Sequence, residues 1–440
     1  MRVLVIGGGA AGLMASISAA KSGADVTIVE KNEKLGKKIY ITGKGRCNVT
    51  NACESAEFLS NVSRNPRFMY SSFGAFNNVD MMDFLAANGL SIKVERGNRV
   101  FPSSDKASDV TKTLANAAKK YGVKVELNTK VKSLLVEDGK CIGAVARHNG
   151  QRCDFLADKV ILATGGISYP ATGSTGDGYK MASDLGIEVT KTYPSLVPIE
   201  ATFAEGYKDE IGRSNSEGHE DATGRSNSEG YELSELAGLS LKNVTAKVLK
   251  GKKEIASEFG EMLFTHTGVS GPIIITISSI ISGKYDINEL QLFIDFKPAL
   301  TLDELDKRLL REFDEAKNKE IKSVMRKLLP DSMTGPMLRY AGICEKQFVH
   351  EITKEQRGRI ARSLKSFELK MKGLGGFNEA IITRGGIDVK EINPSTMESK
   401  KVPGLYFAGE IIDVDAFTGG FNLQLAWSTG YVAGKGATNE

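Results

Sequence analysis

The sequence predicts an α/β protein in which a parallel-sheet domain is interrupted by a second, α+β domain. Three observations support this prediction. A strand, a glycine-rich turn, a helix and another strand follow one another within residues 2–30. Further apolar runs that end in glycine turns come at 158–166 and 403–410. The segment 194–375 has no such pattern, so we expect one domain at 1–193 and 376–440 with 194–375 inserted in it.

Composition narrows the class of protein. Of the 440 residues, 41% are hydrophobic and 25% are charged, as in ordinary globular proteins. The formal net charge of +4 is too small to indicate a nucleic-acid or membrane partner. Five widely spaced cysteines indicate no disulfide framework and favour a reducing cytoplasm. No apolar run has the length of a membrane span, and we interpret the glycine-rich N-terminus as mature structure rather than a signal peptide.

The first thirty residues contain a nucleotide-binding pattern. Residues 2–6 (RVLVI) are typical of a strand that is buried on both faces. The turn at 7–12 fits G-x-G-x-x-G, residues 13–23 predict a helix that ends at Gly23, and the strand 25–30 ends in an acid. This order, rather than the glycines alone, predicts a dinucleotide site.

Each residue of the pattern has a physical role. Gly7 permits the tight turn, Gly9 lets the backbone approach a pyrophosphate, and Gly12 lets the helix pack close to the sheet. Ala10 and Ala11 stand at the helix start, where free N–H groups attract phosphate. Glu30 is expected to accept hydrogen bonds from a ribose diol.

Later segments indicate which dinucleotide binds. Residues 403–410 (PGLYFAGE) predict a strand that ends in a turn, and 418–424 (TGGFNLQ) place a glycine pair before a helix. Together with 158–166 (DKVILATGG), they resemble the two-dinucleotide-binding flavoproteins, whose FAD domain is Rossmann-like and similar to that of glutathione reductase. The resemblance implies non-covalent FAD. It assigns the ribityl-phosphate region to Gly409 and Glu410, the pyrimidine edge to Asn422, Leu423 and Gln424 near Gly420, a mid-chain flavin turn to Ala163, Thr164, Gly165 and Gly166, and an adenine contact to the backbone of Val131.

A narrower resemblance rests on three long motifs. TGKGRCNVTN (42–51), FTHTGVSGP (264–272) and GEIIDVDAFTGGFNLQLAWSTG (409–430) together resemble the BaiN/YhiN-type flavoproteins, also known as aminoacetone-oxidase-like FAD enzymes. This family implies an inserted substrate or cap domain. Its members include a reductase of unsaturated keto-steroids and an oxidase of a small amino-ketone.

Cys47 and Cys53 raise the question of a redox dithiol. Disulfide reductases of this superfamily have four residues between their cysteines, whereas five stand between this pair. A second nucleotide fingerprint is absent too, because the glycines of TGSTGDG (172–178) follow no strand. We therefore expect no dithiol chemistry. We predict that the backbone at Gly43 and Gly45 approaches the cofactor and that Arg46 binds an anion. Cys47 and Asn48 are expected to lie next to the flavin, with simple packing as the alternative for Cys47. Lys31 and Lys37 complete the predicted cofactor residues.

Candidates for catalysis are few. His266, Arg46 and Cys47 are the side chains that we consider, since histidine carries protons near neutral pH. A structural role is the alternative for His266. No spacing of histidines and cysteines indicates a metal site.

The inserted segment predicts strands first and helices from about 301 to 366. Its basic runs are interleaved with acids, which favours solvated helix faces over a nucleic-acid surface. Residues 212–218 and 224–230 both read GRSNSEG, within a tract (205–231) that we expect to be a surface loop without a role in function.

We therefore expect a cytoplasmic FAD-dependent oxidoreductase that moves a hydride between flavin N5 and a small organic substrate, either an enone or keto compound or an amino-ketone. Two forms of this hypothesis compete: an enone reductase to which NAD(P)H binds transiently, and an amine oxidase that uses oxygen. A flavoprotein that acts on RNA is the alternative from a different class. We expect neither nucleic acid nor membrane as a partner. Substrate identity and oligomeric state stay open.

Overall fold

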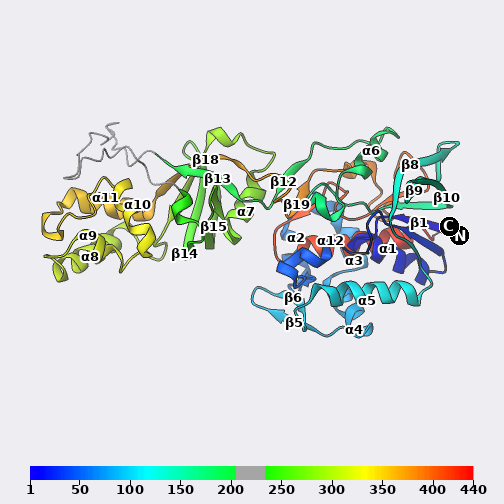
Figure 1. The fold of residues 1–440 in the computed structure, drawn as a ribbon, viewed down its shortest axis with the longest axis horizontal. Helices are drawn as coiled ribbons and strands as arrows, with labels where there is room; N and C mark the ends of the chain where they lie inside the picture. Colours follow the sequence, from blue (N-terminus) through cyan, green and yellow to red (C-terminus); the bar gives the residue numbers. More distant parts are fainter. Residues whose placement is uncertain (205–232, 440) are drawn as a thin grey trace. The chain divides into compact units, whose positions relative to one another are not determined.

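The computed structural model describes residues 1–204 and 233–439. The chain divides into two compact units: unit 1 contains Met1–Ser195 and Gly376–Glu440, and unit 2 contains Leu196–Gly375 (Figure 1). Each unit has its own hydrophobic core. The predicted loop at 205–231, with both GRSNSEG copies, lies outside the described residues.

Unit 1 is built on a five-stranded parallel sheet with the order β20-β11-β1-β2-β7. Its central strands are runs of β-branched and aliphatic residues, which suit a sheet that is covered on both faces. The five strands are β1 (Arg2–Ile6), β2 (Asp25–Val29), β7 (Lys124–Glu126), β11 (Lys159–Leu162) and β20 (Leu405–Phe407).

Smaller sheets and helices complete unit 1. The strands pair as β10-β9-β8, β3-β6-β5, β21-β4 and β12-β19. These strands are β3 (Thr50–Asn51), β4 (Val62–Arg64), β5 (Ile92–Glu95), β6 (Arg99–Pro102), β8 (Thr129–Glu137), β9 (Lys140–His148), β10 (Gln151–Leu156), β12 (Tyr193–Ser195), β19 (Ile382–Arg384) and β21 (Asp415–Ala416). The helices are α1 (Ala10–Lys21), α2 (Ser55–Ser60), α3 (Met69–Ala75), α4 (Asn78–Ala87), α5 (Ala107–Lys120), α6 (Asp177–Ser183) and α12 (Phe421–Gly436).

The first and last helices of the chain pack against each other. A β-carbon on Gly430 would lie 2.4 Å from the Ala11 carbonyl oxygen, and one on Gly434 would lie 2.3 Å from that of Ala15. Only glycine permits this approach. The helix that follows the first glycine turn is thus fixed against the helix that closes the chain.

Unit 2 combines a closed barrel with a helical part. The barrel has the order β13-β16-β15-β14-β17-β18. Its strands are β13 (Ile199–Phe203), β14 (Ser240–Lys250), β15 (Lys253–Phe264), β16 (Gly268–Ser270), β17 (Leu290–Asp295) and β18 (Phe367–Leu374). The helices are α7 (Pro272–Ile281), α8 (Leu302–Glu315), α9 (Ile321–Met325), α10 (Asp331–Tyr340) and α11 (Lys354–Lys365).

The predicted class, an α/β domain with an α+β insertion and helices after residue 301, is confirmed. Two details differ. Pro194 and Ser195, which we assigned to the insertion, belong to β12 of unit 1. Helix α7 lies where we expected strands, because its isoleucine-rich sequence favours strands by propensity, whereas Pro272 at the first helical position and burial of one face favour the helix.

Candidate functional site

The glycine and acid motifs of the sequence meet at one edge of unit 1. Strands β1, β2, β11 and β20 are parallel neighbours, so the segments after them lie at the same edge of the sheet. Gly7 has a φ of +104°, and a β-carbon there would lie 2.5 Å from the Ala163 carbonyl oxygen. A β-carbon on Gly409, whose φ is +80°, would lie 2.6 Å from Ala11 Cβ. The carboxyl edge of a parallel sheet is where such folds bind ligands.

Helix α1 begins at this edge without a side-chain cap. Its N-cap is Gly9, and a β-carbon on Gly9 would have nothing within 4 Å. A β-carbon on Gly12 would lie 1.8 Å from the Gly7 carbonyl oxygen, so only glycine fits there. The first N–H groups of a helix lack partners within the helix. This end therefore presents donors, and room beside Gly9, to an anion.

Glu30 is buried and already holds the glycine turn. Its Oε2 accepts from the Gly8 N–H at 2.7 Å, and its Oε1 accepts from the backbone and side-chain N–H groups of Asn32, both at 2.8 Å. A carboxylate has further lone pairs, so a diol remains an allowed partner. Asn32 was not predicted, although its position two residues after a strand-ending acid is typical of a turn.

The predicted lysines make protein contacts. Lys31 Nζ donates to Asp177 at 2.7 Å, and Lys37 Nζ donates to Glu33 at 3.2 Å. The neighbouring Lys38, which we did not predict, donates to Ser168 Oγ at 2.6 Å and forms an ion pair with Glu410. Lys38 thereby connects the segments after β2, β11 and β20.

Glu410 is the acid of the PGLYFAGE motif. It also accepts from the Thr383 N–H at 2.8 Å and from the Ser168 hydroxyl. These bonds fix its carboxylate within the protein, next to Gly166, where a β-carbon would meet Thr383 Oγ1 at 2.4 Å. The side chain of Glu410 is thus a brace for the turn that contains Gly166.

The TGKGRCNVTN segment turns through left-handed conformations. Gly43, Lys44, Gly45 and Cys47 have φ values between +57° and +84°. Cys47 and Cys53 are both buried free thiols. Burial raises the pKa of Cys47 to about 12 and that of Cys53 to about 11, so both stay protonated at neutral pH. A protonated, buried pair does not suit thiolate chemistry.

Arg46 is held by acids rather than free for an anion. Its guanidinium forms ion pairs with Glu95 and Asp105, and its Cζ lies 4.1 Å from the centre of the Phe101 ring. Lys93 binds the same Asp105 at 2.6 Å. In this arrangement the charge of Arg46 is matched locally, which disfavours the predicted anion contact.

Helix α12 begins beside this segment. Its N-cap is Gly420, with a φ of +99° and no side-chain cap. A β-carbon on Gly420 would lie 2.3 Å from the Thr50 carbonyl oxygen and 2.9 Å from Asn48 Oδ1. Trp427 Nε1 donates to the Val49 carbonyl at 3.0 Å. The two ends of the chain, predicted to contribute to one site, are therefore in direct contact.

Two predicted residues of α12 use their side chains internally. Asn422 exchanges hydrogen bonds with the backbone of Ala416 at 2.7 and 2.9 Å. Gln424 Oε1 accepts from Thr50 Oγ1 at 2.8 Å, and the Gln424 side-chain N–H donates to Ser428 Oγ at 3.1 Å. The backbone N–H of Gln424 donates to the Gly420 carbonyl. Only the N–H groups before Gln424, those of Phe421, Asn422 and Leu423, belong to the open first turn.

Two buried polar atoms, which lack a hydrogen-bond partner in the described part of the chain, indicate that the site accommodates a ligand. Asn48 Oδ1 and Thr164 Oγ1 have no hydrogen-bond partner among the described residues. Such atoms are rare in native proteins. Both belong to predicted flavin residues, and together with the uncapped ends of α1 and α12 they match a ligand with phosphates and a polar ring. The residues present therefore fit FAD.

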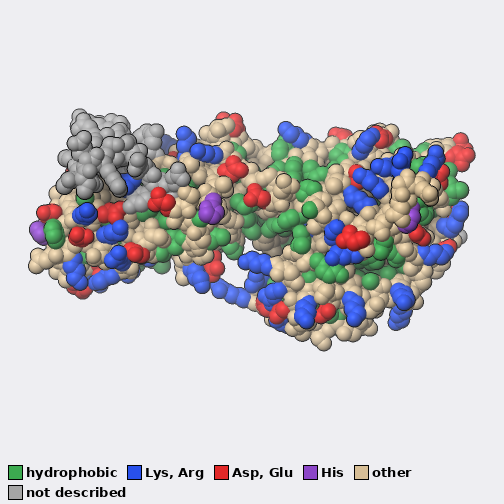
Figure 2. Space-filling model, viewed as in Figure 1, with side chains coloured by type: hydrophobic (Ala, Val, Ile, Leu, Met, Phe, Trp, Pro, Cys, Tyr) green, Lys and Arg blue, Asp and Glu red, His purple; other side chains and the backbone are tan. Residues whose placement is uncertain are grey.

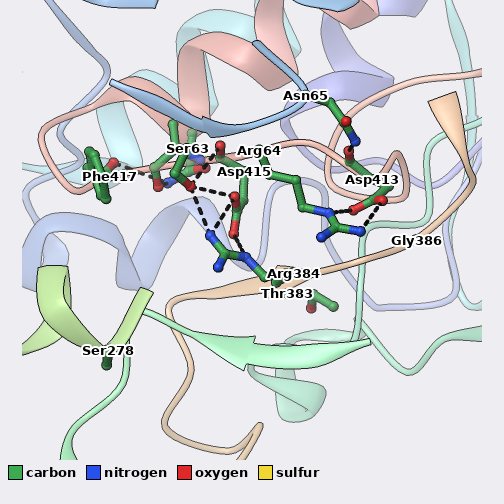
Figure 3. A network of polar contacts seen from close by, with 12 residues as sticks. Ser63, Arg64, Asn65, Ser278, Thr383, Arg384, Gly386, Asp413, Asp415 and Phe417 are labelled. Carbon is green, nitrogen blue, oxygen red and sulfur yellow. Dashed lines mark hydrogen bonds and ion pairs between the residues drawn. The ribbon is translucent and has the colours of Figure 1, made fainter. Parts of the chain in front are cut away.

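Two ion pairs, one of them fully buried, support the segment between Glu410 and α12 (Figure 3). Arg384 donates to Asp415 at 2.8 and 3.1 Å and to Ser63 Oγ at 3.0 Å, and Arg64 pairs with Asp413. Arg384 and Asp415 are at most 1% exposed. None of these five residues was predicted, although the D-V-D of the third motif lies between two predicted flavin segments.

Two further predicted residues lie in β8 and in unit 2. Val131 is buried in β8, where the ladder with β9 shifts register directly after it. His266 lies in unit 2, exposed in the bend between β15 and β16. Among the described residues there is no cluster of metal-ligating side chains, and no helix has the length and apolarity of a membrane span.

Comparison with known proteins decides the family. The family model described as "HI0933-like protein Rossmann domain" matches residues 1–436. The chain belongs to this HI0933-like family. It is a family of FAD-dependent oxidoreductases, and the predicted membership of the BaiN/YhiN-type flavoproteins is confirmed.

Two curated relatives of this HI0933-like protein have different names. A 3-dehydro-bile acid delta(4,6)-reductase of Clostridium scindens is 31% identical, over 99% of this chain and 98% of the relative. A ribosomal RNA dihydrouridine synthase of Haemophilus influenzae is also 31% identical, over 97% and 96%. The predicted exclusion of nucleic acid is therefore not supported by the family.

Solved structures confirm the fold alone. A flavocytochrome c3 fumarate reductase aligns with a TM-score of 0.51 at 18% identity, over 99% of this chain and 78% of the other. A 3-ketosteroid delta1-dehydrogenase of Sterolibacterium denitrificans aligns with a TM-score of 0.50 at 13% identity, over 99% of both chains. The Rossmann-like FAD-binding domain with an inserted domain is thus a shared architecture.

Proposed function

We propose that this HI0933-like protein is a reductase that takes its electrons from NAD(P)H. Its substrate has a carbon–carbon double bond that is conjugated to a carbonyl group, and the enzyme saturates that bond. The observation that carries the proposal is the shared chemistry of two relatives at 31% identity over nearly the full chain. A delta(4,6)-reductase of a 3-dehydro bile acid and a dihydrouridine synthase both saturate such a bond, because C5=C6 of uracil is conjugated to C4=O.

The site residues have proposed roles that are compatible with this chemistry. We propose that Gly7, Gly9 and Gly12 with the start of α1 hold the pyrophosphate, that Glu30 holds the ribose, and that the start of α12 faces the flavin. Bound FAD supplies two-electron hydride chemistry at N5. The substrate gains a hydride at its β-carbon and a proton at its α-carbon, while NAD(P)H is oxidised to NAD(P)⁺.

The chain offers one N-terminal fingerprint, so we propose that NAD(P)H binds transiently at the flavin rather than in a domain of its own. Cys47 stays a thiol at neutral pH because of its burial, which excludes a thiolate nucleophile from the proposal. An RNA substrate is a second candidate, supported by the identity and coverage of the dihydrouridine synthase.

The test is anaerobic mixing of the FAD-loaded protein with NADH or NADPH while the visible flavin band is followed. Bleaching is expected. A 3-keto-4-ene steroid should then restore the band, and the saturated 3-ketosteroid, which lacks only the double bond, should not.

Other outcomes distinguish the alternatives. Restoration by an rRNA transcript and not by the enone would favour the RNA candidate. Bleaching by aminoacetone but not by NAD(P)H, with peroxide formed in air, would make the protein an oxidase. A protein that does not take up FAD would contradict the proposal as a whole.

A further inference from the structure

One polar atom in unit 1 calls for a ligand donor. Asn48 Oδ1 is buried and accepts no hydrogen bond from any described residue. A buried carbonyl oxygen without a donor is destabilising. In a protein whose site fits FAD, the donor is expected to come from the cofactor.

The position of Asn48 is fixed by its neighbours. A β-carbon on Gly43 would lie 2.9 Å from the Asn48 backbone nitrogen. The next residue, Val49, donates to the Val100 carbonyl at 2.8 Å and accepts from Trp427 Nε1 at 3.0 Å. The hydrogen bonds of Val49 hold the backbone after Asn48, and Gly43 packs closely against Asn48 on its other side, so little shift of the loop is available to bring a protein donor to Asn48 Oδ1.

The start of α12 supplies the opposite polarity beside it. Gly420 lies so close that a β-carbon there would be 2.9 Å from Asn48 Oδ1. Gly420 is the N-cap, and the first-turn N–H groups after it are donors without partners inside the helix. The protein therefore presents a lone acceptor next to a group of donors.

This pattern is complementary to one edge of the isoalloxazine ring. N1 and O2 accept hydrogen bonds, whereas the adjacent N3–H donates one. We propose that Asn48 Oδ1 accepts from flavin N3–H while the start of α12 donates to the N1/O2 side, so that Asn48 selects an unsubstituted N3. This inference rests on the proposed FAD site and assigns the residue that reads the pyrimidine edge.

The test compares FAD with 3-methyl-FAD, in which the donor is replaced by a methyl group. The apoprotein should bind FAD about 100-fold more tightly than 3-methyl-FAD, because the methyl group leaves the acceptor unpaired and occupies its space. Asn48→Ala should weaken FAD about 3- to 10-fold and reduce the preference to below about 5-fold. Asn48→Asp keeps an acceptor, so it should keep the preference and make the flavin midpoint potential more negative.

Asn422→Ala is the matched control. Asn422 lies in the first turn of α12, but its side chain binds Ala416, so this change should weaken both flavins equally. A second signature is the pKa of the bound flavin N3–H, followed in the visible spectrum above pH 9. It should fall in Asn48→Ala and stay unchanged in Asn422→Ala.

Equal binding of FAD and 3-methyl-FAD by the wild-type protein would overturn the role of Asn48 and leave the FAD site intact. An unchanged preference in Asn48→Ala would do the same. Failure to bind either flavin would instead contradict the proposed function.

Discussion

Helices α1 and α12 of unit 1 begin in a different way from helices α8 and α11 of unit 2. In unit 1, α1 and α12 start at Gly9 and Gly420, and no side chain caps either end. In unit 2, α8 and α11 start at Thr301 and Thr353, each of which forms a capping box with the residue three positions later. A capped end satisfies its own donors. The glycine ends of α1 and α12 leave their donors open to a ligand. Capping does not follow the division into units, because α4 of unit 1 has a capping box at Asn77 and α7 of unit 2 begins at Gly271 without a side-chain cap.

The charges on the surface give no comparable signal. Figure 2 shows lysines, arginines, aspartates and glutamates mixed over the visible face of both units. Mixed charges of this kind are ordinary for a soluble surface. The contrast therefore lies in how these four helices begin.

The largest effect is expected where the turn and α1 touch. Gly12→Val would press a side chain into the Gly7 carbonyl, and should cost more than about 4 kcal/mol and abolish FAD binding. Urea unfolding followed by the fluorescence of the single tryptophan, Trp427, measures this in unit 1. In unit 2, Gly358→Ala makes only ordinary contacts and should stabilise α11 by about 0.5–1 kcal/mol. Normal FAD uptake by Gly12→Val would contradict the comparison.

The buried ion pair should give the next effect. Arg384→Met leaves Asp415 charged and buried, which should destabilise unit 1 by about 3–5 kcal/mol. The double variant Arg384→Met/Asp415→Leu should lose less, because no charge is left unpaired. The same tryptophan signal measures both. An equal loss of unfolding free energy in the single and double variants would contradict the energetic coupling of Arg384 and Asp415.

Gly9→Ala separates folding from binding. The position has open space, so the apoprotein should keep its stability within about 0.5 kcal/mol. FAD affinity should fall about tenfold, on the order of 1.4 kcal/mol, because the methyl group takes the space of the pyrophosphate. Titration of apoprotein with FAD measures the affinity. A change in stability without a change in affinity would reverse the assignment.

Thr301→Ala provides the counterpart in unit 2. Loss of the cap should destabilise α8 by about 1 kcal/mol, seen as faster hydrogen exchange in its first turns. FAD affinity should stay the same. Weaker FAD binding in this variant would mean that capped and uncapped ends are not separate in function.

The smallest effect at neutral pH concerns the thiols. Buried Cys47 should resist a thiol reagent in the native protein, whereas exposed Cys344 of unit 2 should react at once. Because the folded pKa of Cys47 is raised from 9.0 to about 12, the unfolded state ionises first. Stability should therefore fall as the pH rises from 9 toward 12, and Cys47→Ala should flatten that slope. Rapid labelling of Cys47 at pH 8 would contradict its burial.

The sequence predicted what local geometry dictates. The first glycine turn and the late strand–turn–helix were recognisable because each needs glycine at defined positions. It did not predict which lysine joins the turns, since Lys37 and Lys38 differ only in the face to which they point. Asn422 and Gln424 were identified by position, but their side chains bind the protein instead of facing outward.

Contacts across long separations escaped the sequence analysis. Arg64 and Asp413 meet across 349 positions, and no local pattern specifies that pairing. The closed barrel of unit 2 depends on strand register, which is likewise set by tertiary packing. Helix α7 shows packing and a proline overriding β-propensity.

The pairing of β12 with β19 has a consequence for how a chain with an inserted domain can change in evolution. The antiparallel ribbon ends where unit 2 begins, at Leu196, and unit 2 closes its own entrance with a hydrogen bond of 2.9 Å from Gly375 N–H to the Pro198 carbonyl. Entry and exit are thus neighbours. Because its two ends are adjacent, unit 2 could be replaced by recombination, or its loops could lengthen, without a change in the strand order of the parallel sheet in unit 1.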